Sequence, residues 1–282
     1  MSPALGGRRC VVTGASGGIG EAIAHTLVEH GADVVVTARE GPRLAAAVDR
    51  LRDVRRGAKV QAIGADLALQ AEVRRVAATL GTDPVDVLVL NAAVIPAARV
   101  ETRDGLEQTL AVDHLAPFLL TQLLRPRFTP RTRVVVVGAD PGWSSREPVD
   151  LDDLAFSEGF SPARAYMRTK NMNAMFTYAL ARRLSGTGIT VNAAHPGVIA
   201  TSLGRRMHGL VGLALAAARP FLPSPTRGAD TPAWLAWSPE VAGVSDHFFV
   251  KRRRRATAAH TLDVERQDAL WSASEALTGS YA

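Results

Sequence analysis

The stretch Thr13-Gly14-Ala15-Ser16-Gly17-Gly18-Ile19-Gly20 decides the fold of this 282-residue chain. It overlaps the end of residues 10–13, Cys-Val-Val-Thr, a short apolar run that predicts a buried strand. After the glycines, apolar residues recur at helical spacing through residues 19–28. A strand, a glycine-rich turn and a helix in this order form the first half of a βαβ unit.

The glycine spacing in this turn is typical of a dinucleotide-binding site. Gly14 permits the tight turn, Gly18 lets the backbone approach a pyrophosphate, and Gly20 lets the helix pack closely on the sheet. The start of the helix also offers free N–H groups and the positive end of its dipole to the phosphates. Ser16 and Ile19 lie in the same stretch and are further candidate cofactor contacts.

Strands and helices alternate along the rest of the chain. Each predicted strand is a nearly continuous apolar run, as expected for a parallel sheet that is covered on both faces. The further predicted strands are residues 33–37, 59–63, 85–90, 133–137, 190–194 and 247–250, and the further predicted helices are residues 44–52, 105–124 and 166–184. We predict one α/β domain over residues 1–282: a Rossmann-type, doubly wound parallel sheet of about seven strands with helices on both faces.

The composition agrees with a globular protein and gives little support to nucleic-acid binding. Apolar residues make up 47% of the chain, enough for a large core, and the formal net charge is +6. Arginine is spread along the chain, apart from the cluster Lys251-Arg252-Arg253-Arg254-Arg255. This cluster follows a predicted strand and has few aromatic neighbours, so we predict a solvated turn rather than a nucleic-acid site.

Other features bear on location and on metals. The N-terminus has no apolar segment of the signal-peptide kind, and the apolar residues 210–218 are too few to span a bilayer. The single cysteine, Cys10, cannot form a disulfide within the chain. The seven histidines show no metal-ligand spacing. We therefore expect a cytoplasmic protein with no integral membrane segment and no metal site.

The second informative motif is Tyr166-Met167-Arg168-Thr169-Lys170, at the start of a predicted helix. Tyr166 and Lys170 are four residues apart, so they share one helix face. With the glycine turn before it and His195-Pro196-Gly197 after it, the chain resembles the short-chain dehydrogenase/reductase family over essentially its whole length. Within that family it is similar to the retinol dehydrogenase-like reductases, for example at Trp271-Ser272-Ala273-Ser274-Glu275.

This resemblance implies roles for the tyrosine and the lysine. In the family, the tyrosine phenol exchanges a proton with the substrate oxygen. The lysine bonds the nicotinamide ribose and, together with the positive charge of the cofactor, lowers the pKa of the tyrosine. Tyr166 would therefore be the acid/base and Lys170 its partner, and both would contact the cofactor.

The resemblance also implies the rest of the cofactor site. Arg39 follows the second predicted strand, where family members often place a basic residue for the adenosine 2′-phosphate, so NADP(H) is the expected cofactor. As alternatives, Arg39 is an ordinary exposed arginine, and the acidic residue after the third strand is an ordinary helix N-cap. The other contacts that the resemblance implies are Asp66, Leu67, Asn91, Ala92, Pro196, Gly197, Val198 and Thr201.

Two positions depart from the family pattern. The catalytic serine at the end of the fifth strand falls on Ala139, and a helix asparagine that helps to carry a proton-relay water falls on Asp113. Losing one such hydrogen-bond donor costs about 10²–10³ in rate. Ser144, Ser145 or Asp140 could replace the hydroxyl, or the protein no longer reduces carbonyls in the ordinary way. Asp113 could pair with the catalytic lysine and change the relay, so it is a third catalytic candidate.

The sequence favours an NADP(H)-dependent oxidoreductase that acts on a carbonyl or hydroxyl of an apolar small molecule. The apolar residues 202–225 would cover the substrate, as the lid of the family does, although they also fit a buried helix pair. The altered site and the composition suggest specialised metabolism in a GC-rich bacterium, and the family implies a homo-oligomer. Two alternatives stay open: a non-redox tailoring enzyme, such as a dehydratase, cyclase or epimerase, and a catalytically silent binding protein.

Overall fold

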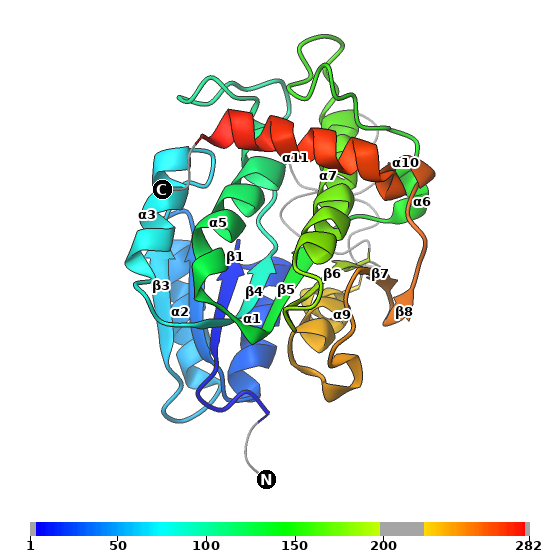
Figure 1. Ribbon diagram of the computed structural model, residues 1–282. Coiled ribbons are helices and arrows are strands. Elements are labelled where there is room, and N and C mark those ends of the chain that lie inside the picture. The colour runs from blue at the N-terminus through cyan, green and yellow to red at the C-terminus, as the bar shows by residue number, and fades with distance from the viewer. Residues whose placement is uncertain (1–3, 198–222, 280–282) are drawn as a thin grey trace.

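The computed structural model describes residues 4–197 and 223–279 (Figure 1). The strands found there are β1 (Arg9–Thr13), β2 (Asp33–Ala38), β3 (Val60–Gly64), β4 (Val85–Leu90), β5 (Phe128–Val137), β6 (Thr190–His195), β7 (His247–Val250) and β8 (Arg253–Arg254). These eight strands form one sheet in the order β3-β2-β1-β4-β5-β6-β7-β8. Strands β1 to β7 pair in parallel, and β8 is antiparallel to β7.

Helices cover both faces of this sheet. The helical segments of the described residues are α1 (Gly18–Glu29), α2 (Pro42–Asp53), α3 (Gln70–Thr79), α4 (Gln108–Leu110), η1 (Ala111–Leu115), α5 (Ala116–Leu124), η2 (Arg125–Arg127), α6 (Pro141–Ser144), α7 (Pro162–Arg183), α9 (Pro225–Trp237), η5 (Pro239–Val241), α10 (Ala259–Leu262) and α11 (Val264–Thr278). One face of the sheet packs against α1, α2 and α9, with Leu27 and Trp234 in that core. The other face packs against α3, α5 and α7, with Leu119 and Leu180 in that core.

Helix α11 lies outside the second helix layer, across α5 and α7 (Figure 1). The ring of Trp271 packs against both helices, with its centroid 4.9 Å from that of Phe118 and 6.1 Å from that of Phe176. The guanidinium group of Arg183 lies 4.1 Å from the centroid of the Trp271 ring. Helices α5 and α7 are therefore packed between the sheet and α11.

The predicted doubly wound parallel sheet is confirmed, but its far edge differs from the prediction. Only the first part of residues 251–255 forms the expected turn, because Lys251 and Arg252 have positive φ angles of 51° and 59° and reverse the chain. Arg253 and Arg254 then pair with β7 as the short strand β8. Both arginine side chains of β8 are exposed, so the strand has no apolar pattern in the sequence.

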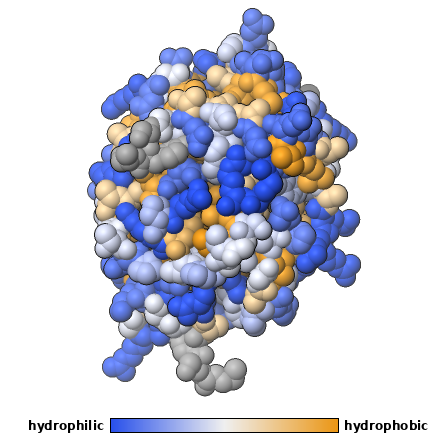
Figure 2. All heavy atoms as spheres, viewed as in Figure 1, coloured by the Kyte–Doolittle hydropathy of each residue, from blue (hydrophilic) through white to orange (hydrophobic). Residues whose placement is uncertain are grey.

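The face of the molecule seen in Figure 2 is mostly hydrophilic, with apolar side chains scattered between polar ones. No helix in the described ranges is long and apolar enough to cross a membrane. A few large apolar side chains reach the surface, among them Trp143, which is 44% exposed. The same ranges contain no group of three His, Cys, Asp or Glu side chains placed to hold a metal ion.

Candidate active site

The glycine turn joins the carboxyl end of β1 to α1. Gly14 has a positive φ of 71°, and a Cβ atom there would come 2.7 Å from the Cα atom of Ala92. A Cβ atom at Gly20 would come 2.5 Å from the carbonyl oxygen of Gly14, so a side chain fits at neither position. Helix α1 begins at Gly18, and its N-cap residue Gly17 has no side chain to bond the first N–H groups. These N–H groups fit the pyrophosphate of a dinucleotide.

A threonine hydroxyl that no sequence motif points to ties this turn to β4. The Oγ1 atom of Thr13 donates to the carbonyl oxygen of Val89 at 3.3 Å and accepts from the N–H groups of Asn91 and Ala92 at 2.9 and 3.1 Å. The side-chain amide of Asn91 donates to the carbonyl oxygens of Thr13 and Gly14 at 2.8 and 3.3 Å. The side chain of Asn91 therefore stabilises the glycine turn in the conformation that a cofactor would need.

Two exposed arginines lie near the carboxyl end of β2. Arg39 follows the strand directly, and Arg43 lies in the first turn of α2. No ion pair is found for either guanidinium group within the described residues, so both are free to bond a phosphate. Arg43 was not predicted, because an arginine near the start of a helix forms no distinctive pattern.

The other candidate cofactor contacts lie in the loop after β3 and around the start of α1. Asp66 is exposed in the loop after β3, and its Oδ1 atom accepts from the N–H of Ala68 at 3.1 Å. This bond closes a turn within the loop, and the N-cap of α3 is Leu69, so the alternative that Asp66 is an ordinary helix N-cap is wrong. Leu67 is buried in the same loop, whereas Ser16 and Ile19 are half-buried around the start of α1.

Tyr166, Lys170 and Asp113 lie together at the centre of the candidate site. Helix α7 carries the first two, with the Nζ atom of Lys170 5.1 Å from the centroid of the Tyr166 ring. The same Nζ atom lies 3.3 Å from Oδ2 of Asp113, and the two side chains of this ion pair are 3% and 0% exposed. The other carboxylate oxygen accepts from the N–H of Val94 at 2.8 Å. Asp113 thus links α7 to the loop that follows β4.

Asp113 sits in a π-helical segment. We predict one helix over residues 105–124, but the helix begins at Gln108 and widens to a π-helix in η1 before α5 continues it. Glu107 caps this helix, since its carboxylate accepts from the N–H groups of Thr109 and Leu110 at 2.8 and 2.7 Å. Widened turns of this kind are frequent at functional sites. No periodicity in the sequence distinguishes them from an ordinary helix.

His114, next to Asp113, joins three helical segments. Its Nδ1 atom lies 3.3 Å from Oδ1 of Asn173 on α7, and its Nε2 atom lies 2.9 Å from Oγ of Ser274 on α11. The amide of Asn173 also donates to the backbone carbonyl oxygen of Asp113 at 2.8 Å. Burial lowers the pKa of His114 to about 4, so its ring is neutral near pH 7 and serves as a structural link.

Burial also governs the charges of the central groups. It raises the pKa of Asp113 to about 6, against the opposing effect of the Lys170 ammonium. Burial acts to lower the pKa of Lys170, but the attraction of Asp113 and Tyr166 is larger together, so that pKa is raised and the ammonium persists. For Tyr166, burial raises the pKa and Lys170 partly offsets the rise. Lys170 therefore acts to lower the pKa of Tyr166, as the family resemblance implies, but burial raises that pKa by a larger amount.

The end of β5 carries no hydroxyl, because the buried Ala139 occupies it. Asp140 follows, and its Oδ1 atom caps α6 by accepting from the N–H groups of Gly142 and Trp143 at 3.0 and 3.2 Å. Its Oδ2 atom lies 3.9 Å from Nε2 of His195 at the end of β6. Asp140 is thus held at the edge of the site, with one oxygen committed to the helix.

The two serines proposed as substitutes lie at the end of the same short helix, where Ser144 is the last residue of α6 and Ser145 is its C-cap. Ser145 is exposed, and its hydroxyl donates to the carbonyl oxygen of Gly142 at 3.1 Å. Ser144 is buried, and its carbonyl oxygen accepts from the amide of Asn171 at 2.8 Å. The amide of Asn171 also donates to the carbonyl oxygen of Glu147 at 2.7 Å. Asn171 therefore fastens α6 and the chain after it to α7.

Arg168, inside the tyrosine–lysine motif, holds the loop between α6 and α7. Its Nη2 atom lies 3.3 Å from Oε1 of Glu147, and both side chains are buried. Its guanidinium group also lies 3.9 Å from the ring centroid of Phe156 and donates to the carbonyl oxygen of Asp153 at 2.8 Å. A buried arginine is predicted by no simple pattern, so this support for α7 was missed.

The nicotinamide end is described only in part. Pro196 and Gly197 directly follow β6, and Gly197 has a positive φ of 90°. Val198 and Thr201, the two further predicted contacts, lie outside the described residues. The predicted substrate cover over residues 202–225 also lies outside them, apart from residues 223–225.

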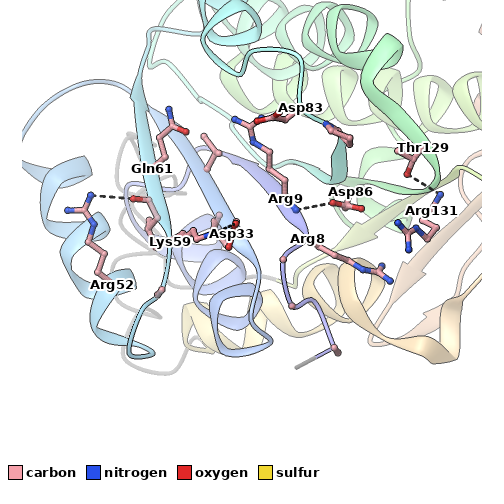
Figure 3. A pocket seen from close by; sticks show the side chains of 18 residues that line it. Arg8, Arg9, Asp33, Arg52, Lys59, Gln61, Asp83, Asp86, Thr129 and Arg131 are labelled. Carbon is pink, nitrogen blue, oxygen red and sulfur yellow. Dashed lines mark hydrogen bonds and ion pairs between the residues drawn. The ribbon is translucent and has the colours of Figure 1, made fainter. Parts of the chain in front are cut away.

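A hollow of about 1020 Å³ in the described surface lies elsewhere (Figure 3). It is lined by residues around the amino ends of β1, β2, β3 and β4, the edge opposite to the glycine turn. Charged groups there are partly paired with one another, as Lys59 is with Asp33 at 3.2 Å and Arg9 with Asp83 at 3.4 Å. Ligands of parallel sheets bind outside the carboxyl ends of the strands, so size alone does not make this hollow the active site.

Comparisons with known proteins agree with the geometry. Residues 8–147 match the family model described as short chain dehydrogenase. Human retinol dehydrogenase 14 is 34% identical over 97% of this chain and 87% of its own length. A protein from Streptomyces sp. (strain C5), provisionally named as a daunorubicin C-13 ketoreductase, is 34% identical over 99% of this chain and 95% of its own length.

Solved structures give the same result. An uncharacterized protein from Mycobacterium paratuberculosis is 30% identical, with a TM-score of 0.79 over 98% of this chain and 95% of that one. A blue fluorescent protein from a metagenomic library, solved in complex with NADPH, is 29% identical, with a TM-score of 0.69 over 88% of this chain and 97% of that one.

Proposed function

The chain belongs to the short-chain dehydrogenase family, and from this premise we propose that it is an NADP(H)-dependent oxidoreductase acting on a carbonyl or hydroxyl of an apolar small molecule. Members of this family are oxidoreductases. The observation that carries the proposal is the group of Tyr166, Lys170 and Asp113, because Asp113 bonds the loop after β4 that also bonds the glycine turn. A related structure that holds NADPH supports the choice of cofactor.

In the proposed reaction, Tyr166 moves a proton and Lys170 positions the reactants. When bound, the nicotinamide cofactor supplies or accepts a hydride. The phenol of Tyr166 donates its proton to the substrate oxygen during reduction and takes it back during oxidation. The ammonium of Lys170 bonds the cofactor ribose and lowers the cost of an ionised phenol. Asp113 holds that ammonium, and the Thr13–Asn91 hydrogen bonds hold the glycine turn.

An apolar substrate is supported by the exposed side chain of Trp143. This residue lies on α6, six residues after the last residue of β5, and its side chain is 44% exposed. The names of two relatives, a retinol dehydrogenase and a protein provisionally named as a daunorubicin C-13 ketoreductase, refer to small organic molecules with a carbonyl or hydroxyl group. The Streptomyces relative also supports a role in bacterial specialised metabolism.

The experiment follows nicotinamide absorbance with a panel of apolar ketones and alcohols, beside product analysis without cofactor. Cofactor-dependent turnover supports the proposed oxidoreductase. A change of substrate without any redox change would instead support the non-redox tailoring enzyme, which the missing hydroxyl at Ala139 favours. No turnover of either kind would support a silent binding protein.

Arg39 is expected to determine the preference for NADPH. The variant Arg39→Asp should lose about 1–3 kcal/mol of NADPH binding, because charge-assisted bonds to the 2′-phosphate are replaced by repulsion, and should then prefer NADH. Calorimetric titration of both cofactors measures this. Arg131→Asp, at the opposite edge of the sheet, makes the same charge change and should leave the preference intact. Equal affinity of the parent protein for both cofactors would refute the assignment of Arg39.

Restoring a hydroxyl at position 139 tests how the site has changed. If only a donor were missing, Ala139→Ser would raise ketone reduction by about 10²–10³. We expect a gain of less than about threefold, because the paired carboxylate of Asp113 also distinguishes this site and one hydroxyl does not remove it. Steady-state rates with one ketone measure the effect. A gain of two orders of magnitude or more would mean that the missing donor is the only defect.

A further inference from the structure

The buried part of the candidate site contains more negative than positive charge. Asp113 and Glu107 are 0% and 2% exposed, and the carboxylate of Glu107 lies near enough to affect Asp113 electrostatically. Lys170 is the buried cation that pairs with Asp113, at 3.3 Å, and its Nζ atom also lies 5.1 Å from the centroid of the Tyr166 ring. The ammonium of Lys170 therefore pairs with Asp113, while Glu107, whose carboxylate caps α4, acts on Asp113 only as a second negative charge.

The other titratable groups that face Asp113 add no charge near pH 7. Burial lowers the pKa of His114, on the same π-helical segment, to about 4, so its ring is neutral. Burial raises the pKa of Tyr166, on α7, so its phenol keeps its proton. The N–H of Val94 is the remaining partner, and it stabilises a carboxylate rather than a carboxylic acid. The net charge of this group is about −1.

We propose that Asp113 sets the redox preference of the bound cofactor, favouring the oxidised over the reduced nicotinamide and so making NADPH a better hydride donor on this protein. The proposal rests on the NADP(H)-dependent function proposed above. The oxidised ring carries one positive charge, which it gains when a hydride leaves for the carbonyl carbon. The proton for the carbonyl oxygen comes from Tyr166, so electrons and protons balance.

The sign of the effect on the cofactor follows from comparing Asp113 with the asparagine that the family pattern has at this position. With a neutral asparagine at position 113, the ammonium of Lys170 would repel the positive ring that forms beside the ribose it bonds. The carboxylate of Asp113 cancels that ammonium at 3.3 Å, and Glu107 adds further negative charge. A unit charge within about 10 Å, at an effective dielectric constant near 20, changes a binding constant by roughly tenfold. Asp113 is thus a positioning residue whose charge acts through Lys170 and on the cofactor.

The test compares affinities for the two redox forms, which requires no turnover. In Asp113→Asn, the ratio of the NADPH dissociation constant to the NADP⁺ dissociation constant should fall roughly tenfold. Fluorescence or calorimetric titration of each form gives this ratio. Asp268→Asn is the matched control: it also removes one negative charge, from an exposed carboxylate that pairs with Arg182 and Arg183. The control should keep the parent ratio.

A pH series on the parent protein keeps the proposal testable if the variant folds poorly. From about pH 8 to about pH 5, protonation of Asp113 should move the parent ratio toward the variant value. The cofactor 2′-phosphate titrates in this range as well, but it is identical in both redox forms and cancels in the ratio. His195 is a further histidine of the candidate site, and it is present in both the parent protein and Asp113→Asn, so its protonation affects the ratio equally in both. A flat ratio in the variant therefore assigns the pH dependence to Asp113.

The outcomes separate this proposal from the function on which it rests. A ratio that falls in Asp113→Asn and with decreasing pH in the parent supports it. Binding of both redox forms with a ratio unchanged in Asp113→Asn, or equally pH-dependent in both proteins, overturns the role of Asp113 and leaves the oxidoreductase intact. Failure of the parent protein to bind either form overturns the proposed function itself.

Discussion

Replacing Tyr166 with phenylalanine is expected to reduce turnover by about 10²–10⁴, the usual contribution of a positioned general acid. The change removes one oxygen atom from a half-buried side chain. Among the described residues, that phenol oxygen has no hydrogen-bond partner, so fold and cofactor affinity should change little. Single-turnover rates with NADPH and a reactive ketone, beside a cofactor titration, measure the two effects separately.

Tyr178 provides a matched control on the same helix. Its hydroxyl lies 3.0 Å from Oγ1 of Thr257, away from the ion pair of Lys170, so Tyr178→Phe removes a structural hydrogen bond. This variant should lose about 1 kcal/mol of folding stability and keep its turnover. If Tyr166→Phe were as active as Tyr178→Phe, the proton transfer would have to be assigned to another group.

Replacing Lys170 with methionine is expected to give the largest loss of stability and to weaken cofactor binding as well. The variant leaves the fully buried carboxylate of Asp113 without its ammonium, and breaking a buried pair in this way costs about 3–5 kcal/mol. The lost ribose contact should weaken cofactor binding at the same time. Urea unfolding and a cofactor titration measure the two losses.

The pH dependence of the Lys170→Met stability has a definite sign. Without the ammonium, burial leaves the pKa of Asp113 raised in the folded state, while in the unfolded chain it is ordinary, near about 4. Between these values the folded state binds a proton that the unfolded state does not, so the free energy of unfolding rises as pH falls. The variant should therefore recover stability in mildly acidic solution.

A double variant at Asp113 and Lys170 separates the loss of folding stability from the loss of cofactor binding. Asp113→Asn/Lys170→Met removes both charges, so it should recover most of the lost stability at neutral pH. It should not recover cofactor binding, because the ribose contact is still missing. If the double variant were no more stable than Lys170→Met, the cost would come from packing and not from an unpaired charge.

The sequence predicted the elements that depend on local patterns. The apolar runs at residues 33–37 and 85–90 became strands with nearly the same bounds, and the four-residue spacing of Tyr166 and Lys170 places both on one face of α7. These features follow from periodicity and helix geometry, which are properties of neighbouring residues. The parallel arrangement of the strands followed from the alternation of strands and helices.

The remaining features depend on contacts between distant segments. Thr13 bonds Asn91 across 78 residues, and Arg168 bonds Glu147 in a loop with no pattern of its own. The sequence raised the pairing of Asp113 with Lys170 only as an option, because the packing of η1 against α7 sets their distance. The π-helical widening at η1 likewise depends on its surroundings, as does β8, whose exposed arginines lack strand periodicity.

The hydrogen bond between His114 and Ser274 has a consequence for how the protein is made. It joins residues 160 positions apart, and Trp271 packs beside it against both α5 and α7. The ribosome releases α11 after every other described helix and strand. The strands β2 and β4, which pair with β1, and Asn91, which bonds the glycine turn, are synthesised well before α11. The glycine turn can therefore form its hydrogen bonds on the ribosome before α11 covers α5 and α7, so the part of the fold around α7 is completed last.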